Sequence, residues 1–276
     1  MPLKIAHSNS WRRKEKIHGG FRRWLPIFHI LFILLLIFIL TSLFYRWFLE
    51  NKGSSQKGSS VDLFKAAIVD GIGLTRPNSI FIKNVKGILE NAGLSVDVYA
   101  GENVTIDLLG KIGGYGLLIL RLHSAIDTTH RFLYLFSAER FNRTEYETRF
   151  SNILGVEPTA IREGKTFENE SYFALRADLL GYMNYGGLNG STIILMGCNG
   201  TNSDHAIDRL FEKGVKAIIA WDGYVDLNYT DKITSELIKA IYEEGYDPND
   251  AVRKVMEDYG PDPVYKSELK YLANPS

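Results

Sequence analysis

Five short apolar runs, separated by amphipathic stretches, constrain the fold of this chain more than any other feature. Each run has four to seven residues that are mostly apolar, and several of these are β-branched. Runs of this length and composition are typical of strands that are buried on both faces of a parallel sheet. We expect such strands at Ala66–Val69, Ser95–Tyr99, Leu117–Leu122, Thr192–Met196 and Val215–Trp221.

Helix signals occupy the segments between these runs. Apolar residues recur there at helical spacing, and each segment begins with a residue whose side chain can accept hydrogen bonds from the first turn. The residues predicted to open helices are Asn78 or Ser79, Thr105, Ser203, Thr230 and Asp247, the last followed by Pro248. Strands alternating with helices predict a three-layer α/β domain with a mainly parallel sheet.

Residues 131–190 depart from this alternation. Phe132, Tyr134 and Phe136 alternate with other residues, as side chains do on one face of a β-strand. We therefore expect a hairpin or small antiparallel insertion between the third and fourth core strands. Its aromatic side chains are expected to pack onto the sheet.

An uncharged apolar segment, Trp24–Tyr45, precedes the domain and has 22 residues, enough for a helix that crosses a bilayer. Basic residues dominate the stretch before it, which predicts a cytoplasmic N-terminus. A cleaved signal peptide is the alternative, but no small-x-small cleavage site follows. The predicted organisation is a basic cytoplasmic tail (1–23), a single-pass transmembrane signal anchor (24–48), a Gly/Ser linker (49–61) and an extracytoplasmic domain (62–276).

Charge and cysteine content narrow the partners and cofactors. Residues 1–50 carry eight Lys and Arg against two Asp and Glu, so the remainder holds 24 against 30, a net charge of −6. An acidic domain is unsuited to binding phosphate backbones, so we expect no nucleic acid partner. The expected partners are a lipid bilayer, through residues 24–48, and a protein or peptide outside the cytoplasm.

One cysteine excludes an internal disulfide and any zinc site built on several thiolates. His123, Asp127, His130 and His205 show no recognised zinc-binding spacing, and no nucleotide-binding motif is complete. We therefore expect no metal and no cofactor.

Six Asn-x-Ser/Thr triplets lie in the predicted domain, as expected for an exported glycoprotein. Predicted glycosylation sites are Asn103, Asn142, Asn169, Asn189 and Asn228. The sixth triplet begins at Asn199, directly after Cys198, where a glycan would obstruct an active site.

Functional groups in an open parallel sheet collect beyond the carboxyl ends of its strands. His123 directly follows the third predicted strand, and Cys198 follows the fourth after one glycine. If these strands are neighbours, a nucleophile and a base project into one crevice. A nearby imidazole and the helix that begins near Ser203 would each lower the pKa of the thiol.

Each residue has a plain structural interpretation when it is considered alone. A histidine after a strand is commonly a hydrogen-bonding residue, and a lone cysteine is commonly buried and inert. The pair at corresponding strand ends is the more specific signal. An amidotransferase elbow fits poorly, because Met196 stands where that motif requires glycine.

The segments LLILRLHSA and STIILMGCNGTN, followed by a helix and GVKAIIAWDGYVD, resemble the caspase-like cysteine peptidase fold of clostripain, gingipain, legumain, the caspases and CHAT-type domains. The resemblance covers about residues 62–260. It implies that Cys198 is the nucleophile and His123 the general base. The oxyanion hole would consist of the backbone N–H groups of Ser124 and Cys198.

Two positions depart from the family pattern. Ser124 replaces the usual glycine after the histidine, and Met196 stands where clostripain-like enzymes bind a basic substrate side chain through an acidic residue. Trypsin-like specificity is therefore not predicted. Asp222 and Asp70, at two other strand ends, are the candidate pocket residues.

The resulting prediction is a membrane-anchored, extracytoplasmic cysteine peptidase that hydrolyses peptide bonds through a thioester acyl-enzyme. The alternative is a non-catalytic surface domain that keeps the peptidase-like fold for binding or scaffolding.

Overall fold

The computed structural model describes residues 32, 34–42, 61–150, 159–184 and 187–275, which divide into two units, Met1–Ser55 and Gln56–Ser276. In the first unit, residues 32 and 34–42 are helical. Among the described residues there is no helix of the length and apolar character that a membrane span requires. The predicted tail (1–23) lies outside the described residues, as do most of the predicted anchor (24–48) and linker (49–61).

A six-stranded sheet forms the centre of the second unit, in the order β10-β9-β8-β3-β1-β2. Within this sheet β1, β2, β3, β8 and β9 are parallel, and β10 joins β9 antiparallel at one edge. The bounds are β1 Asp62–Asp70, β2 Ser95–Ala100, β3 Tyr115–Arg121, β8 Thr192–Leu195, β9 Ala217–Trp221 and β10 Leu269–Ala273. The five predicted strands and the mainly parallel α/β sheet are confirmed, whereas β10 was not predicted.

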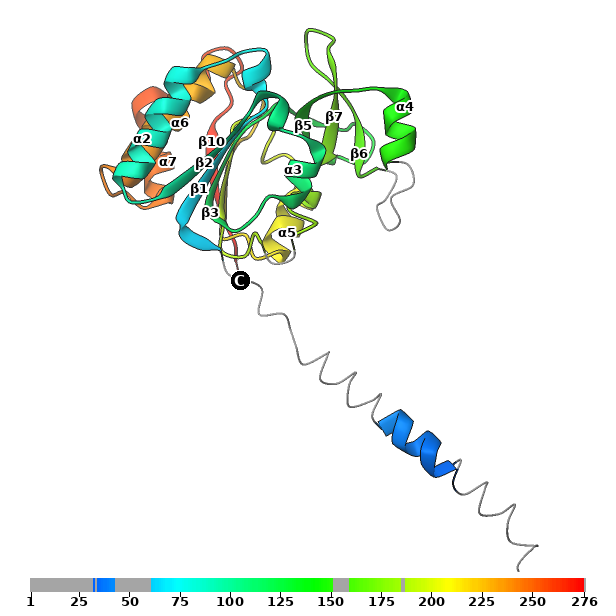
Figure 1. Cartoon of the computed structure of the whole chain (residues 1–276). Coiled ribbons are helices and arrows are strands. Elements are labelled where there is room, and N and C mark those ends of the chain that lie inside the picture. The colour runs from blue at the N-terminus through cyan, green and yellow to red at the C-terminus, as the bar shows by residue number, and fades with distance from the viewer. Residues whose placement is uncertain (1–31, 33, 43–60, 151–158, 185–186, 276) are drawn as a thin grey trace, which may run out of the picture. The chain divides into compact units, whose positions relative to one another are not determined.

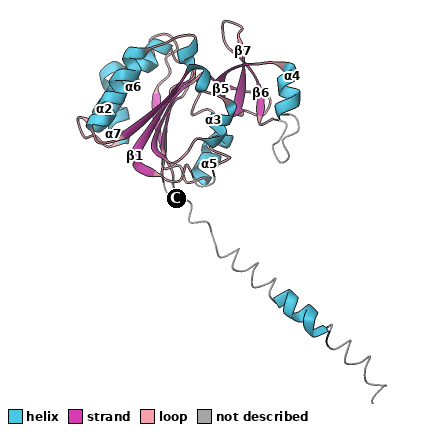
Figure 2. Ribbon diagram, in the orientation of Figure 1, coloured by secondary structure: helices cyan, strands magenta, loops and turns pink. Residues whose placement is uncertain are grey.

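Helices cover both faces of this sheet (Figures 1 and 2). One face packs against α2 (Ser79–Asn91), α6 (Leu227–Tyr242) and α7 (Pro248–Tyr259), and α3 (Ile106–Lys111) and α5 (Asp204–Glu212) lie on the other. Short 3-10 turns occupy Ile72–Leu74, Gly101–Asn103 and Ala177–Leu179.

The predicted helix starts are confirmed for Asn78, Thr105, Ser203 and Asp247, whose side chains accept first-turn N–H groups. The start predicted at Thr230 is wrong. Helix α6 begins at Leu227, because the Asp226 carboxylate accepts the N–H groups of Asn228 and Tyr229.

Alternate residues of the central strands are buried on opposite faces of the sheet. Val69 and Leu120 join the core beneath α3 and α5, whereas Ile68 and Ile119 join the core beneath α2 and α6. All four side chains are 0–1% exposed. Burial on both faces explains why these strands appear in the sequence as nearly continuous apolar runs.

A second sheet, antiparallel and in the order β4-β5-β7-β6, forms the insertion. Its strands are β4 Ser124–Ile126, β5 Leu133–Arg140, β6 Ile161–Lys165 and β7 Ser171–Arg176, and α4 (Arg143–Glu145) and a π-helical turn (Tyr146–Phe150) follow β5. The insertion thus begins at Ser124, directly after His123, and not at the expected residue 131.

The alternation seen in β5 is confirmed, but its two sides have different partners from those expected. Leu133 and Leu135 contact the main core, whereas Tyr134 and Phe136 form a separate cluster with Tyr172 and Ala174. Branched aliphatic side chains therefore attach the small sheet to the large one. The aromatic side chains cover the opposite face.

A buried arginine joins the carboxyl ends of the sheet strands to the helical layer. Arg121, at the end of β3, is 1% exposed and lies between two buried carboxylates. Its Nη1 is 2.7 Å from Asp70 Oδ1 at the end of β1, and its Nε is 2.8 Å from Asp231 Oδ1 on α6. Its Nη2 donates to Asp231 Oδ2 and to the Arg76 carbonyl oxygen. One side chain thus fixes two strands, a helix and the β1–α2 loop.

Arg121→Met should destabilise the domain severely. It would leave Asp70 and Asp231 buried without a counter-charge, and breaking a buried ion pair in this way costs about 3–5 kcal/mol. Urea denaturation of the two proteins measures the difference. Arg143→Met is the matched control, because the exposed pair of Arg143 with Glu147 should contribute nothing measurable. Equal unfolding midpoints for Arg121→Met and the unchanged protein would contradict the assignment.

Candidate functional site

The strands that carry the predicted dyad are neighbours. β3 and β8 pair in parallel, with Leu120 opposite Leu195. His123 follows the end of β3 by two residues, and Cys198 follows the end of β8 by three. Both residues therefore emerge at the same edge of the sheet, where the carboxyl ends of parallel strands collect functional groups.

His123 and Cys198 line one pocket of about 520 Å³. Both residues are half-buried. Met196, Gly197, Leu122 and Thr230 also line this pocket. The remaining wall comes from four connections, β1–α2, β6–β7, β9–α6 and α7–β10, and from the first residue of α6. It contains Ile72, Thr75, Arg76, Phe167, Glu168, Glu170, Val225, Asp226, Leu227 and Tyr265.

The two loops that carry the dyad touch each other directly. Ser124 Oγ donates a hydrogen bond of 2.6 Å to the Cys198 carbonyl oxygen. A Cβ atom at Gly197 would overlap both Ser124 Oγ and the Leu122 carbonyl oxygen. Only glycine permits this approach, so the backbone of the cysteine loop is held against the backbone of the histidine loop.

A second set of hydrogen bonds holds the floor of the pocket. Thr230 Oγ1 donates to the Met196 carbonyl oxygen at 3.1 Å, and the Trp221 indole N–H donates to Thr230 Oγ1 at 2.9 Å. Both Trp221 and Thr230 are fully buried. The turn that leads into Cys198 is thus fixed to β9 and α6.

Burial sets the protonation of both candidate catalytic groups. It raises the pKa of the Cys198 thiol, and the N–H of Val225, which hydrogen-bonds the sulfur, only partly opposes this rise. Burial likewise lowers the pKa of the His123 imidazole, against the opposing charges of Glu168 and Glu170. The expectation of a lowered thiol pKa is therefore wrong. Desolvation dominates, and α5 begins only at Asp204, six residues beyond the cysteine.

The two proposed oxyanion donors lie where the loops meet. Ser124 is the first residue of β4. The hydrogen bonds to β5 are made by His123 O and Asp127 N, and alternate residues of an antiparallel strand direct their backbone groups to the partner. The N–H of Ser124 therefore points away from β5. Serine in place of glycine adds a side-chain hydroxyl, and that hydroxyl ties Ser124 to Cys198.

Asp70 and Asp222, the two candidate pocket residues, do not line the pocket of Cys198. Asp70 is buried against Arg121 and accepts the N–H of Gly73 at 2.8 Å. Asp222 Oδ1 accepts the N–H of Glu268 at 2.8 Å and thereby supports the edge strand β10. Both carboxylates have structural partners that explain their positions.

Sequence reasoning missed the acidic side of the pocket. Glu168 and Glu170 lie in the β6–β7 loop, which is distant in sequence from both strand ends. Arg76 forms an exposed ion pair with Glu168 at 3.3 Å, and Arg140 forms one with Glu170 at 2.7 Å. No motif in the sequence marks these residues. In contrast, the charged Arg121 inside the apolar run LLILRL was a visible signal of a buried ion pair.

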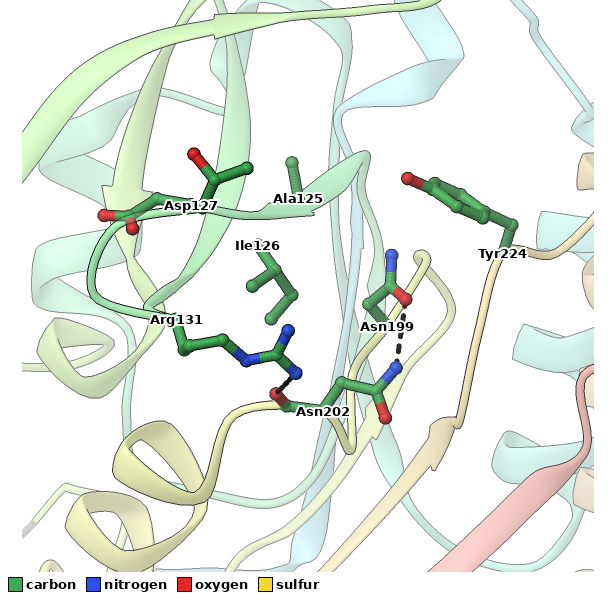
Figure 3. A pocket seen from close by; sticks show the side chains of 8 residues that line it. Ala125, Ile126, Asp127, Arg131, Asn199, Asn202 and Tyr224 are labelled. Carbon is green, nitrogen blue, oxygen red and sulfur yellow. Dashed lines mark hydrogen bonds between the residues drawn. The ribbon is translucent and has the colours of Figure 1, made fainter.

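A smaller pocket of about 270 Å³ lies beside the first, along β4 (Figure 3). Ala125, Ile126, Asp127, Thr128 and Arg131 line one side, and Asn199, Asn202 and Tyr224 line the other. Asn202 Nδ2 donates to Asn199 Oδ1 at 3.0 Å and to the Asp222 carbonyl oxygen at 2.9 Å. The residue next to Cys198 therefore belongs to this second pocket.

The predicted glycosylation sites differ in accessibility. Asn103, Asn142, Asn169, Asn189 and Asn228 are all exposed. Asn199 is half-buried, adopts a φ of 59°, and donates its backbone N–H to the Gly223 carbonyl oxygen at 2.7 Å. A glycan on Asn199 would have to grow from inside the smaller pocket, whereas the other five positions open to solvent.

Neither metal ligation nor sequence comparison adds to this site. Within the described ranges, no group of three or more His, Cys, Asp and Glu side chains is arranged to hold a metal ion. No protein-family model and no curated protein sequence matches the chain.

Gly197→Ala should destabilise the domain by about 1–3 kcal/mol, the usual cost of forcing an extra methyl group into a packed site. The added Cβ would separate the two loops, because one of the atoms that it meets is backbone. Chemical denaturation measures the loss. The matched control is Gly87→Ala in α2, where a Cβ meets no atom within 4 Å and helix propensity favours alanine. Equal stability of Gly197→Ala and the unchanged protein would show that the loops are not in this contact.

Cys198 should be alkylated slowly by iodoacetamide at neutral pH. Only the thiolate reacts, and burial raises the pKa of this thiol above its ordinary value of 9.0. The rate constant should therefore lie below that of a cysteine peptide at pH 7.5 and still be increasing at pH 9. The same protein in urea, where the thiol is free, is the control. A rate that levels off below pH 8 would contradict this protonation state.

Proposed function

We propose that the domain is a cysteine peptidase that acts on polypeptides through Cys198 and His123. The observation that carries this proposal is their position on neighbouring strand ends in one pocket. The caspase-like resemblance assigns the same two residues as nucleophile and base.

The chemistry starts from a neutral pair, because burial disfavours both the thiolate and the imidazolium. As Sγ attacks the peptide carbonyl carbon, His123 accepts the thiol proton. The N–H groups of Ser124 and Cys198 stabilise the oxyanion. The C–N bond then breaks, and His123 returns the proton to the departing amine. A water molecule, deprotonated by His123, hydrolyses the thioester and restores the thiol.

No hydrogen bond joins the Cys198 thiol to the His123 ring, although the structure describes both residues. In this scheme substrate binding brings the thiol and the imidazole within hydrogen-bond reach, so that His123 can accept the proton as sulfur attacks. Catalytic hydrogen bonds are often long in free enzymes and shorten only when substrate binds.

A non-catalytic binding domain is the second candidate, and the raised pKa of the thiol favours it. In that case the pocket binds a polypeptide, and Cys198 serves only as a small, half-buried residue. The two candidates differ in whether Cys198 forms a covalent intermediate.

The proposed location is outside the cytoplasm, on a membrane anchor formed by residues 24–48. The uncharged segment Trp24–Tyr45 and the basic residues before it support this orientation. The exposure of five Asn-x-Ser/Thr asparagines is compatible with modification during export.

Acylation by p-nitrophenyl acetate tests the proposed chemistry. The protein should release a burst of p-nitrophenol up to one equivalent, with the acetyl group located on Cys198 by mass spectrometry. His123→Ala should slow acylation by about 100-fold or more, as expected for loss of a general base. Because the pKa of His123 is lowered from its ordinary 6.5, the rate should hold between pH 7 and 8 and fall only below pH 6.5.

His205→Ala is the matched control, because this imidazole lies outside the pocket, near Asp178 and Phe132. It should leave the burst unchanged. A Cys198 that carries no acetyl group, or an acylation rate that does not depend on His123, would favour the non-catalytic domain.

A further inference from the structure

β4 has a free backbone edge that begins at the candidate catalytic site. The order β4-β5-β7-β6 places β4 at the edge of the small sheet. Phe136 donates its N–H to His123 O at 2.9 Å, and Asp127 donates its N–H to Phe132 O at 2.9 Å. In an antiparallel pair, alternate residues direct both backbone groups to the partner strand. Ser124 and Ile126 therefore direct their N–H and C=O groups away from β5.

The smaller pocket lies along this edge (Figure 3). Ala125 and Ile126 of β4 form one side, and Asn199 and Asn202 face them across the opening. The Asn199 amide nitrogen points away from Asn202, toward the opening between Ala125 and Tyr224 (Figure 3). The three β4 residues are only half-buried, so the chain does not cover the edge completely.

The oxyanion donor and the edge strand are parts of the same backbone. A peptide whose reacting carbonyl oxygen accepts the Ser124 N–H already lies beside β4. The N–H of Ile126 lies two residues further along β4, which corresponds to about 6.8 Å at the rise per residue of an antiparallel strand. An extended peptide repeats its backbone groups over this same distance, so it can also pair with Ile126 without changing register.

We propose that β4 is a docking strand, on which an extended polypeptide substrate adds a strand to the small sheet through the backbone groups of Ser124 and Ile126. The inference rests on the proposed function, because it places the reacting bond of that peptide at Cys198. The peptide runs from the pocket of Cys198 into the smaller pocket, where the Asn199 amide donates to its backbone. Recognition of this kind depends on hydrogen bonds to the main chain of the substrate and requires an unfolded or extended segment.

The chemistry of the smaller pocket suits main-chain recognition. Its charged side chains have local partners. Asp127 accepts the N–H groups of Thr129 and His130 at 2.8 and 2.6 Å, and Arg131 donates to the Asn202 carbonyl oxygen at 3.3 Å. Amide and backbone groups of the Asn199 loop remain to contact a peptide. We therefore expect weak selectivity for side chains on this side of the reacting bond.

Amide hydrogen exchange on the Cys198→Ala protein tests the docking strand without requiring catalysis. The probe is reduced, carboxymethylated lactalbumin, an unfolded polypeptide, at saturating concentration. Exchange should slow in the fragment that spans residues 122–128. The fragment that contains β6, at the opposite edge of the same sheet, should not change. Protection confined to other segments, or no protection anywhere, would overturn the proposal.

Proline substitution then tests the backbone groups. Ile126→Pro removes one outward N–H and should weaken binding of the carboxymethylated polypeptide at least tenfold in the Cys198→Ala background. Lys165→Pro is the matched control on β6, where Arg176 donates its N–H to Ala160 O and the N–H of residue 165 consequently also points outward. Equal binding by Ile126→Pro and the parent would overturn the docking strand.

The docking strand and the peptidase activity can be contradicted independently of each other. If β4 is protected but Cys198 is never acylated, the strand binds polypeptides in a domain without catalysis. If Cys198 is acylated but β4 stays unprotected, the peptidase assignment stands and substrate binds elsewhere.

Discussion

The ion pairs of Arg121 are the interaction on which the rest of this structure depends. A guanidinium that is 1% exposed must be fully satisfied, and here two carboxylates and a backbone carbonyl oxygen satisfy it. Its partners come from β1, α6 and the β1–α2 loop. The same residue ends β3, two positions before His123. The geometry of the candidate site thus rests on a charged cluster directly beneath it, which belongs to the folding of the sheet rather than to the chemistry.

The sequence predicted the central sheet well, because strands buried on both faces carry their signal in every residue. It did not predict β10, whose five residues, Leu-Lys-Tyr-Leu-Ala, are mostly half-buried and lack the continuous apolar run of the other strands. The start of α6 was also missed, since Asp226 and Thr230 are both acceptable caps and only the turn after β9 distinguishes them. Local patterns identified the elements, and tertiary contacts decided their ends.

The candidate site, like the fold, was predictable from the sequence only in part. The shared position of His123 and Cys198 was predictable, since both come within three residues of a strand end and parallel strands bring their ends together. The roles suggested for Asp70 and Asp222 were not supported, because the same strand-end rule also collects residues that hold the scaffold. The pKa of the thiol could not be predicted, since desolvation depends on the depth of the pocket. Glu168 and Glu170 reach that pocket from a hairpin whose position no local pattern specifies.

The contact at Gly197 has a consequence for how the two candidate catalytic residues can move. A van der Waals contact between main chains, together with the Ser124 hydroxyl, joins the loop of the nucleophile to the loop of the base. Neither loop can shift alone without opening that contact. The contact therefore fixes the separation of the two backbones that carry Cys198 and His123, and only rotation of their side chains can change the distance between sulfur and imidazole.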